Sequence, residues 1–185
     1  MGHCTGRQIV ALVVFLRGLN VGGHRTFRPA TLAARLEHLG TVNIGATGTF
    51  VVRKRVRRRQ LRSEVSSLVP FEVEMVICDG REVSDLLSRD HFRGLRLRAG
   101  IIRFASVLTK SPRLTPGLPC TLPSRGKWLV KVLARHGRFV VGAYRRDMKV
   151  IGVLGKLDRM FGVAATTRSW NTLESIAKVL AGGTT

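Results

Sequence analysis

The chain of 185 residues is long enough for one large domain or two small ones with a buried core. Its hydrophobic content of 44% excludes general disorder. Lysine and arginine (32) outnumber aspartate and glutamate (11) and give a formal net charge of +21. This excess favours a polyanionic partner, and the alternative is a genome bias toward arginine on an ordinary surface.

The first half of the chain predicts strands and helices in alternation. Ile9 to Leu16 is a continuous apolar run, which predicts a central strand covered on both faces. Pro29 and three leucines at helical spacing predict a helix that ends at Gly40. The further expected elements are a strand at Thr49 to Val52, a helix at Arg57 to Leu68, a strand at Phe71 to Cys78, a turn at Asp79-Gly80 and a short helix at Val83 to Leu87. Strands and helices in this order are typical of a ferredoxin-like unit.

The second half begins with an expected strand at Ile101 to Leu108. The following loop, Thr109 to Gly126, holds four of the six prolines and is interpreted as a lid or as a strap over a sheet edge. A hairpin turning at His136-Gly137 comes next. The last expected elements are a helix with Val150, Leu154, Leu157 and Phe161 on one face, a strand at Val163 to Thr167, and a final helix capped by Asn171 with Glu174 at its third position.

The cysteines and histidines form no known metal or disulfide pattern. Cys4, Cys78 and Cys120 are widely spaced, and the sequence contains no C-x-x-C or H-x-x-x-H pair. We therefore expect no disulfide framework, no metal and no cofactor. The apolar run before Arg17 is too short to span a membrane and lacks a signal-peptide cleavage site, so we expect a cytoplasmic protein with no membrane partner.

Two motifs carry a family resemblance: LRGLNVGG at Leu16 to Gly23 and ATTRSWNT at Ala165 to Thr172. Together they resemble the signatures of a bacterial family, domain-of-unknown-function family 1697, over nearly the whole chain. The resemblance implies an α+β fold of two ferredoxin-like subdomains, which we place at residues 1–92 and 93–185. It implies no established activity, cofactor or substrate. The chain departs from the usual family residues at Thr47-Gly48-Thr49, Gly155-Lys156 and Ser169.

The glycine-rich stretch RGLNVGG (residues 17–23) leaves two interpretations open. It matches neither G-x-G-x-x-G nor a Walker loop. Its backbone amides could form an anion-binding nest, or its glycines could only permit a tight turn. The anion-binding candidates of this stretch and its flank are Arg17, Asn20, Gly22, Gly23, His24 and Arg25.

The basic segment, residues 53–59, holds six cations in seven positions. They are Arg53, Lys54, Arg55, Arg57, Arg58 and Arg59. Such a run at a strand-to-helix junction cannot be buried, so it is either a solvated face or a patch that contacts phosphates. We favour phosphate contact. Only Phe50 and Phe71 lie nearby as aromatic residues, which predicts binding to the backbone of a nucleic acid without sequence readout.

The second motif places Arg168 and Trp170 at the entrance of the last helix. The tryptophan beside an arginine could stack on a base, or it could anchor the core between the subdomains. No Ser-His-Asp set or carboxylate pair is visible, so we predict no catalytic residue. We expect a cytoplasmic module that binds DNA, RNA or another polyanion. The alternatives are an enzyme or receptor for a small phosphorylated ligand at the RGLNVGG loop, and a protein-interaction module.

Overall fold

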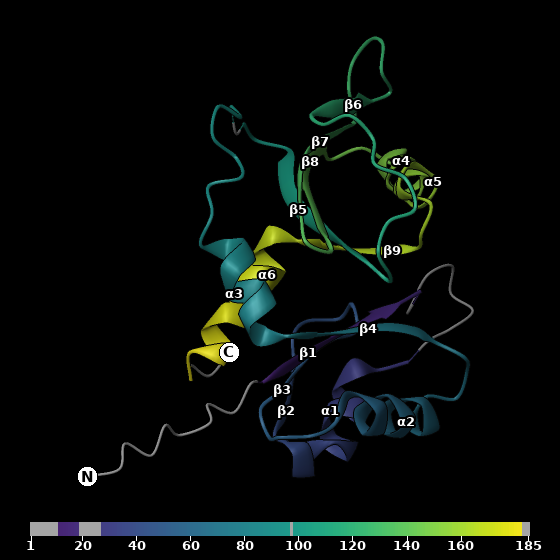
Figure 1. Ribbon diagram of the computed structural model, residues 1–185, viewed down its shortest axis with the longest axis vertical. Coiled ribbons are helices and arrows are strands. Elements are labelled where there is room, and N and C mark those ends of the chain that lie inside the picture. The colour runs from purple at the N-terminus through teal and green to yellow at the C-terminus, as the bar shows by residue number, and fades with distance from the viewer. Residues whose placement is uncertain (1–10, 19–26, 97, 183–185) are drawn as a thin grey trace.

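The computed structural model describes residues 11–18, 27–96 and 98–182. It shows a mixed α+β fold with two antiparallel sheets, one above the other in Figure 1. The α+β class is therefore confirmed. Five of the candidate site residues, Asn20, Gly22, Gly23, His24 and Arg25, lie outside the described residues.

The first sheet has the strand order β2-β3-β1-β4. Its strands are β1 (Leu12–Arg17), β2 (Thr41–Asn43), β3 (Thr49–Val52) and β4 (Glu74–Asp79). The helices of this half are α1 (Pro29–Arg35), a 3₁₀ turn η1 (Glu37–Leu39), α2 (Arg58–Leu68) and α3 (Gly80–Leu87).

Strand β1 is central, as its apolar run predicts. It pairs with β3 on one edge and with β4 on the other. Alternate side chains of a strand point to opposite faces. Val13 and Phe15 accordingly enter the core between the two sheets, whereas Val14 and Leu16 pack toward α1 and α2 on the outer face. Both faces are covered, which is why the sequence of β1 is apolar throughout.

The second sheet has the strand order β6-β7-β8-β5-β9. Its strands are β5 (Ile101–Leu108), β6 (Cys120–Leu122), β7 (Val130–His136), β8 (Phe139–Arg145) and β9 (Ala165–Ser169). The helices of this half are α4 (Val150–Leu154), α5 (Lys156–Phe161) and α6 (Trp170–Leu180). The order β7-β8-β5-β9 repeats the order β2-β3-β1-β4, and each set is followed by one helix, α3 or α6.

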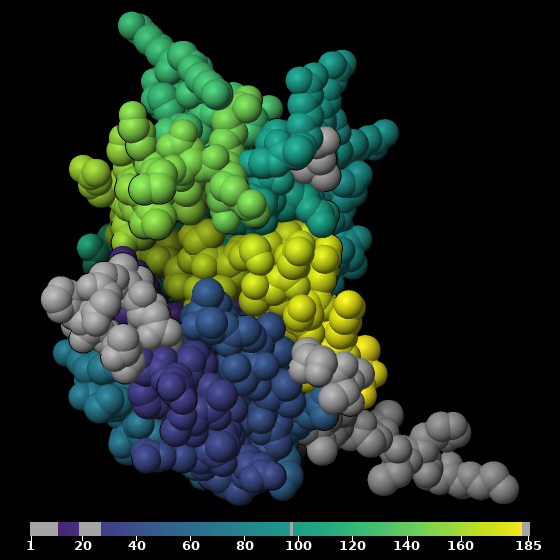
Figure 2. All heavy atoms as spheres, turned by 180° about the vertical axis from the view of Figure 1, so that it is seen from behind, coloured from purple at the N-terminus to yellow at the C-terminus, as the bar shows by residue number. Residues whose placement is uncertain are grey.

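Helices α3 and α6 lie between the two sheets, where they pack against each other (Figure 1). A single core cluster joins them to β1, β3 and β4 on one side and to β5 and β8 on the other. Helices α4 and α5 cover the far face of the second sheet. From behind, the C-terminal segment forms a band between the two halves (Figure 2). The halves therefore share a core, and neither buries its inner face alone.

The proline-rich loop acts as a strap at the sheet edge, one of its two predicted roles. It contributes β6, which pairs with β7 at the edge of the second sheet. It occupies the place in chain order that α1 takes in the first half. Its residues Arg113 and Leu114 also donate main-chain N–H groups to the Phe161 carbonyl at the end of α5.

Three local expectations are wrong, each because of a capping or breaking residue. Asp79-Gly80 is no turn: Asp79 caps α3 and forms a capping box with Glu82, so the helix begins at Gly80. The cap of α6 is Ser169, whose Oγ accepts the Thr172 N–H, and Asn171 lies inside the helix. The predicted helix from Val150 to Phe161 is divided at Gly155 into α4 and α5.

Within the part of the chain that the structure describes, no helix combines the length and the apolarity needed to cross a bilayer.

Gly142 in β8 is required by the packing of the second sheet. A Cβ at this position would lie 2.3 Å from the Lys131 carbonyl oxygen and 2.8 Å from the Phe104 ring. We expect Gly142→Ala to lower the free energy of unfolding by about 3 kcal/mol in urea denaturation, because backbone and ring must both move. Gly152→Ala in α4 is the control: nothing lies within 4 Å, and alanine favours the helix by up to about 1 kcal/mol. Equal effects of the two changes would contradict this packing.

Candidate functional site

The two sequence motifs meet in one cleft between the sheets, here called the junction cleft. Its volume is about 760 Å³. The first motif contributes the end of β1, from Leu16 to Gly18, and the second contributes β9 from Ala165 to Arg168. The remaining wall comes from the start of β4 and from α4 and α5. Segments about 150 residues apart in sequence thus form a single candidate site.

Arg168 lies at the base of the junction cleft and is only 5% exposed. Its Nε donates to the Thr49 hydroxyl at 2.6 Å, and one terminal nitrogen donates to the Thr166 hydroxyl and the Thr167 carbonyl. The other terminal nitrogen donates to the carbonyls of Leu16 at 2.6 Å and Thr47 at 2.9 Å. All five N–H groups of the guanidinium therefore have acceptors within the chain.

The acceptors of Arg168 are all neutral. No carboxylate of a described residue is hydrogen-bonded to it, and the Phe15 ring lies 5.7 Å from the guanidinium carbon. Burial lowers the pKa of Arg168 to about 10. The side chain still carries its charge at neutral pH, and this charge is held by carbonyl and hydroxyl dipoles. Arg168 thus joins β9 to β1 and to the loop before β3, and it faces away from bulk solvent.

Arg17 closes the cleft with an ion-pair network. Its terminal nitrogens each lie 2.6 Å from a carboxylate, one from Glu74 and one from Asp158, and its Nε donates to the Ala165 carbonyl. Asp158 in turn accepts the Ala165 N–H at 2.9 Å. The side chains of Arg17 and Asp158 are about one third exposed. The network covers the outer edge of β9 at Ala165, which would otherwise be free for pairing with another chain.

The lining of the junction cleft combines carboxylates, arginines and threonine hydroxyls. The described residues that line it include Glu72, Glu74 and Asp158, but no cysteine, histidine or lysine. In the core between the sheets, burial raises the pKa of the Cys78 thiol to about 12, so this thiol is protonated at neutral pH. In the described ranges, no group of three acidic, histidine or cysteine side chains is placed to hold a metal ion.

The basic segment lies outside the junction cleft, on the connection from β3 to α2. All six of its cationic side chains are exposed. Arg58 is paired with Asp79 at 2.9 Å and Glu82 at 3.6 Å, and Arg53 donates to the Val179 carbonyl at the end of α6. Lys54, Arg55, Arg57 and Arg59 form no ion pair with any described residue. These four are the cations of the segment that remain available to a partner.

Trp170 is a core residue, in agreement with the anchoring role. It is 5% exposed and packs edge-on against Phe92, with ring centroids 4.7 Å apart. The His91 ring lies 6.0 Å away in a similar orientation. A base could not stack on Trp170 without opening the core between the halves.

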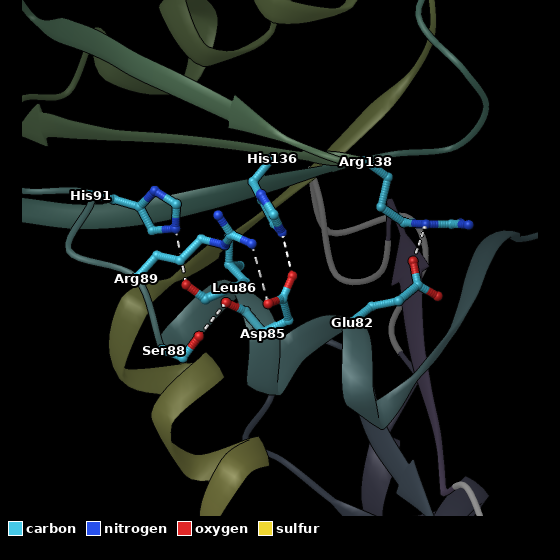
Figure 3. A network of polar contacts seen from close by, with 8 residues as sticks. All are labelled: Glu82, Asp85, Leu86, Ser88, Arg89, His91, His136 and Arg138. Carbon is cyan, nitrogen blue, oxygen red and sulfur yellow. Dashed lines mark hydrogen bonds and ion pairs between the residues drawn. The ribbon is translucent and has the colours of Figure 1, made fainter.

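A second polar contact joins the halves on the α3 side (Figure 3). From the β7–β8 hairpin, His136 Nε2 donates to Asp85 at 2.6 Å and Arg138 Nε donates to Glu82 at 3.0 Å. Arg89 approaches the other oxygen of Asp85, and His91 donates to the Leu86 carbonyl. The hydrogen bond from His136 lowers the pKa of Asp85 below its ordinary value of 3.8. Three of the few acidic and histidine side chains, Glu82, Asp85 and His136, thus serve contacts between the halves.

The predicted site residues therefore fall into three groups. Arg17 and Arg168 converge on the junction cleft, whereas the basic segment runs from the end of β3 into the first turn of α2 and Trp170 lies in the core. Sequence reasoning missed Asp158, Glu74 and Thr49 as partners of these arginines. No local signal marks them, because each contact joins strands or helices that are far apart in sequence.

Comparison with known proteins gives one family. A family model described as "Protein of unknown function (DUF1697)" matches residues 9–109, which include the first motif but not the second. Neither the curated proteins nor the solved structures contain a significant match to the chain.

Replacement of Arg168 tests its role in the fold. Arg168→Lys keeps the charge but has too few donors for the acceptors, so buried carbonyls lose their partners. We expect the free energy of unfolding to fall by about 3 to 5 kcal/mol. The control is Arg159→Lys on the exposed face of α5, which should change it by less than about 0.5 kcal/mol. A variant at position 168 as stable as the control would show that the buried bonds contribute little.

The Asp85–His136 contact predicts a dependence of stability on pH. A carboxyl group with a lowered pKa in the folded state stabilises that state above its ordinary pKa, and the contribution is lost as the pH falls. We expect Asp85→Asn to be less stable than the wild type at pH 6 and the difference to shrink below the ordinary value of 3.8. Thermal unfolding of both proteins across this range measures the difference. A difference that stays constant with pH would exclude the ionised pair as its cause.

Proposed function

The chain belongs to the family of proteins of unknown function (DUF1697), and we propose from its geometry that it binds nucleic acid or another polyanion through the basic segment. One observation carries this proposal: Lys54, Arg55, Arg57 and Arg59 are exposed and have no acidic partner among the described residues. Arg58 of the same segment is instead paired with Asp79 and Glu82.

The position of the segment adds to its positive potential. Arg57 is the N-cap of α2, and the two following residues, Arg58 and Arg59, open the helix. The first turn contains no acidic residue, and no side chain in the described part of the chain caps the helix. The partial positive charge of a helix N-terminus adds to these cations, so the folded chain bears local repulsion here. A bound phosphate would relieve the repulsion and accept the free N–H groups.

The surroundings of the segment support contact with phosphates rather than bases. The Phe50 side chain is buried between the first sheet and helices α1 and α2. Phe71 is half-buried, and its ring packs edge-on against Phe27 with ring centroids 6.4 Å apart. Neither presents a face on which a base could stack. Phosphate contacts position a protein on a nucleic acid but carry no sequence information, so the proposed binding does not discriminate between sequences.

A second candidate is a receptor for a small phosphorylated ligand at the junction cleft. The convergence of both motifs on this cleft supports it. Against it, Arg17 is already bound by Glu74 and Asp158, and the donors of Arg168 are engaged. An anion would have to displace a carboxylate from Arg17, so the basic segment is the better supported site.

We also infer that the first half, residues 1–92, is a ferredoxin-like unit. Its support is the element order β1-α1-β2-β3-α2-β4 with the antiparallel strand order β2-β3-β1-β4. The second half, residues 93–185, has the same arrangement of β7, β8, β5 and β9, with the strap in place of the first helix.

The salt dependence of binding to duplex DNA tests the proposed function. Each neutralised phosphate contributes about −0.9 to the slope of log K against log salt. Replacing Arg55, Arg57 and Arg59 with glutamine should flatten the slope by about two to three units and weaken binding equally for unrelated sequences. Arg58 is left intact because it is paired within the protein.

The matched control changes three exposed arginines of the second half. Arg96, Arg125 and Arg159 replaced by glutamine give the same net charge as the test variant. This control should retain nearly the full slope, because the lost charges lie away from α2. The same loss in both variants would indicate a general charge effect, and a wild type without salt-dependent binding would overturn the proposed function.

A further inference from the structure

The outer face of the second sheet is only partly covered by helices. Helices α4 and α5 cover its middle, where Phe104 and Leu108 share a core cluster with Leu157 and Phe161. Ahead of Phe104, the first three residues of β5 are half-buried. Strand β9 ends opposite Phe104, and from Trp170 the chain continues as α6 between the two sheets. The outer face therefore remains open at the start of β5.

A groove of about 880 Å³ occupies this open part of the face. Ile102 and Tyr144 lie opposite each other in the sheet, and Tyr144 packs against the cluster under α4 and α5. Val150 at the start of α4 also lines the groove, and Ser169 and Asn171 close it where β9 turns into α6. The floor is therefore apolar, and the volume is that of a small-molecule pocket.

Three polar side chains of the groove have no hydrogen-bond or ion-pair partner in the part of the chain that the structure describes. They are the Tyr144 hydroxyl, the Arg146 guanidinium and the Asn171 amide. Arg103 differs from Arg146, because Glu174 holds it at 3.3 Å. Arg146 is exposed, so its guanidinium is available to a ligand that lies in the groove.

The charge around the groove favours an anion with a single charge. Arg146 contributes one positive charge to the lining, and the exposed Lys149 contributes another beside it. Asp147 also lines the groove, and its carboxylate accepts the Lys149 main-chain N–H at 2.8 Å. This carboxylate would repel a phosphate dianion more strongly than a carboxylate monoanion. The planar fork of an arginine matches the two oxygens of a carboxylate.

Met148 marks the rim of the groove as a surface for apolar contact. Its side chain lines the groove and is 97% exposed, which is unusual for a large apolar residue. A methionine side chain is flexible and polarisable, so it adapts to apolar groups of different shapes. An apolar ligand on the floor would thus be contacted from the rim as well.

We propose that this groove binds a small molecule with an apolar body and a single carboxylate. The apolar body packs on Ile102, Tyr144 and Val150, and the carboxylate pairs with Arg146. An apolar floor with a few polar groups that fix the orientation of the ligand is the usual composition of such a site. The groove lies on the second sheet, whereas the basic segment lies between β3 and α2, so this proposal does not depend on the proposed function.

Three related probes test the proposal by dividing the ligand into its parts. 4-Phenylbutyrate has the ring and the carboxylate, 4-phenylbutan-1-ol lacks the charge, and butyrate lacks the ring. Each is titrated into the full-length protein labelled with ¹⁵N. We expect phenylbutyrate to bind in the low millimolar range, with the largest amide shifts at residues 101–103 and 144–150. The alcohol should bind about fivefold more weakly, and butyrate at least about tenfold more weakly.

Two variants locate the carboxylate of the bound probe. Arg146→Gln should abolish the difference between the acid and the alcohol and leave the affinity of the alcohol unchanged, because only the charged group pairs with Arg146. The control Arg159→Gln, exposed on α5, loses the same charge and should keep the about fivefold difference.

Four outcomes would each overturn the proposal. They are equal affinities of the acid and the alcohol for the wild type, equal affinities of phenylbutyrate and butyrate, largest shifts outside the groove, and a difference between acid and alcohol that the Arg146 variant retains. Loss of that difference in the Arg159 variant as well would show a general charge effect and would also overturn it.

Discussion

The buried guanidinium of Arg168 is the interaction on which the arrangement of the two halves depends. A charge that leaves water without a carboxylate partner is costly, and it is tolerated only when every donor is satisfied. Its acceptors come from the end of β1, from the loop before β3 and from β9 itself. The three segments must hold fixed positions for the bonds to form together. Arg168 thereby sets how the second sheet sits on the first, and α3 and α6 fill the space beside it.

The cationic side chains of the molecule fall into two sets: those bonded within the fold, as Arg168 is, and those exposed on the surface. Arg17, Arg58, Arg138 and Arg168 are engaged by acceptors of the chain and stabilise its fold. The chain has few acidic residues, and α3 and α5 place several of them in these contacts. Most of the remaining cations are exposed, and those at the start of α2 are concentrated where a helix N-terminus adds to their potential. A polyanion that binds there need not disturb the junction between the halves.

Local sequence patterns predicted the helices and strands better than they predicted the contacts between distant side chains. The apolar run of β1 identified a central strand because a strand that is buried on both faces has apolar residues at successive positions. Helix starts were predicted less well, because Asp79-Gly80 also fits a turn and because Asn171 lies close enough to Ser169 to be taken for the cap. The exposure of the basic segment could be predicted from its density of charge. The burial of Arg168 could not be predicted from the sequence around it. Nothing near Arg168 in sequence shows that carbonyls of Leu16 and Thr47 lie within reach.

The most direct test of this division of charges follows both sets of arginines in one titration. In the ¹⁵N-labelled protein, the amides of residues 53–59 and the Nε–H of Arg168 can be observed while a short DNA duplex is added at low salt. We expect shifts that centre on residues 53–59, with the Arg168 Nε–H unchanged because its bond to Thr49 is retained. A shift of the Arg168 Nε–H with residues 53–59 unaffected would contradict it, and would place the anion site in the junction cleft.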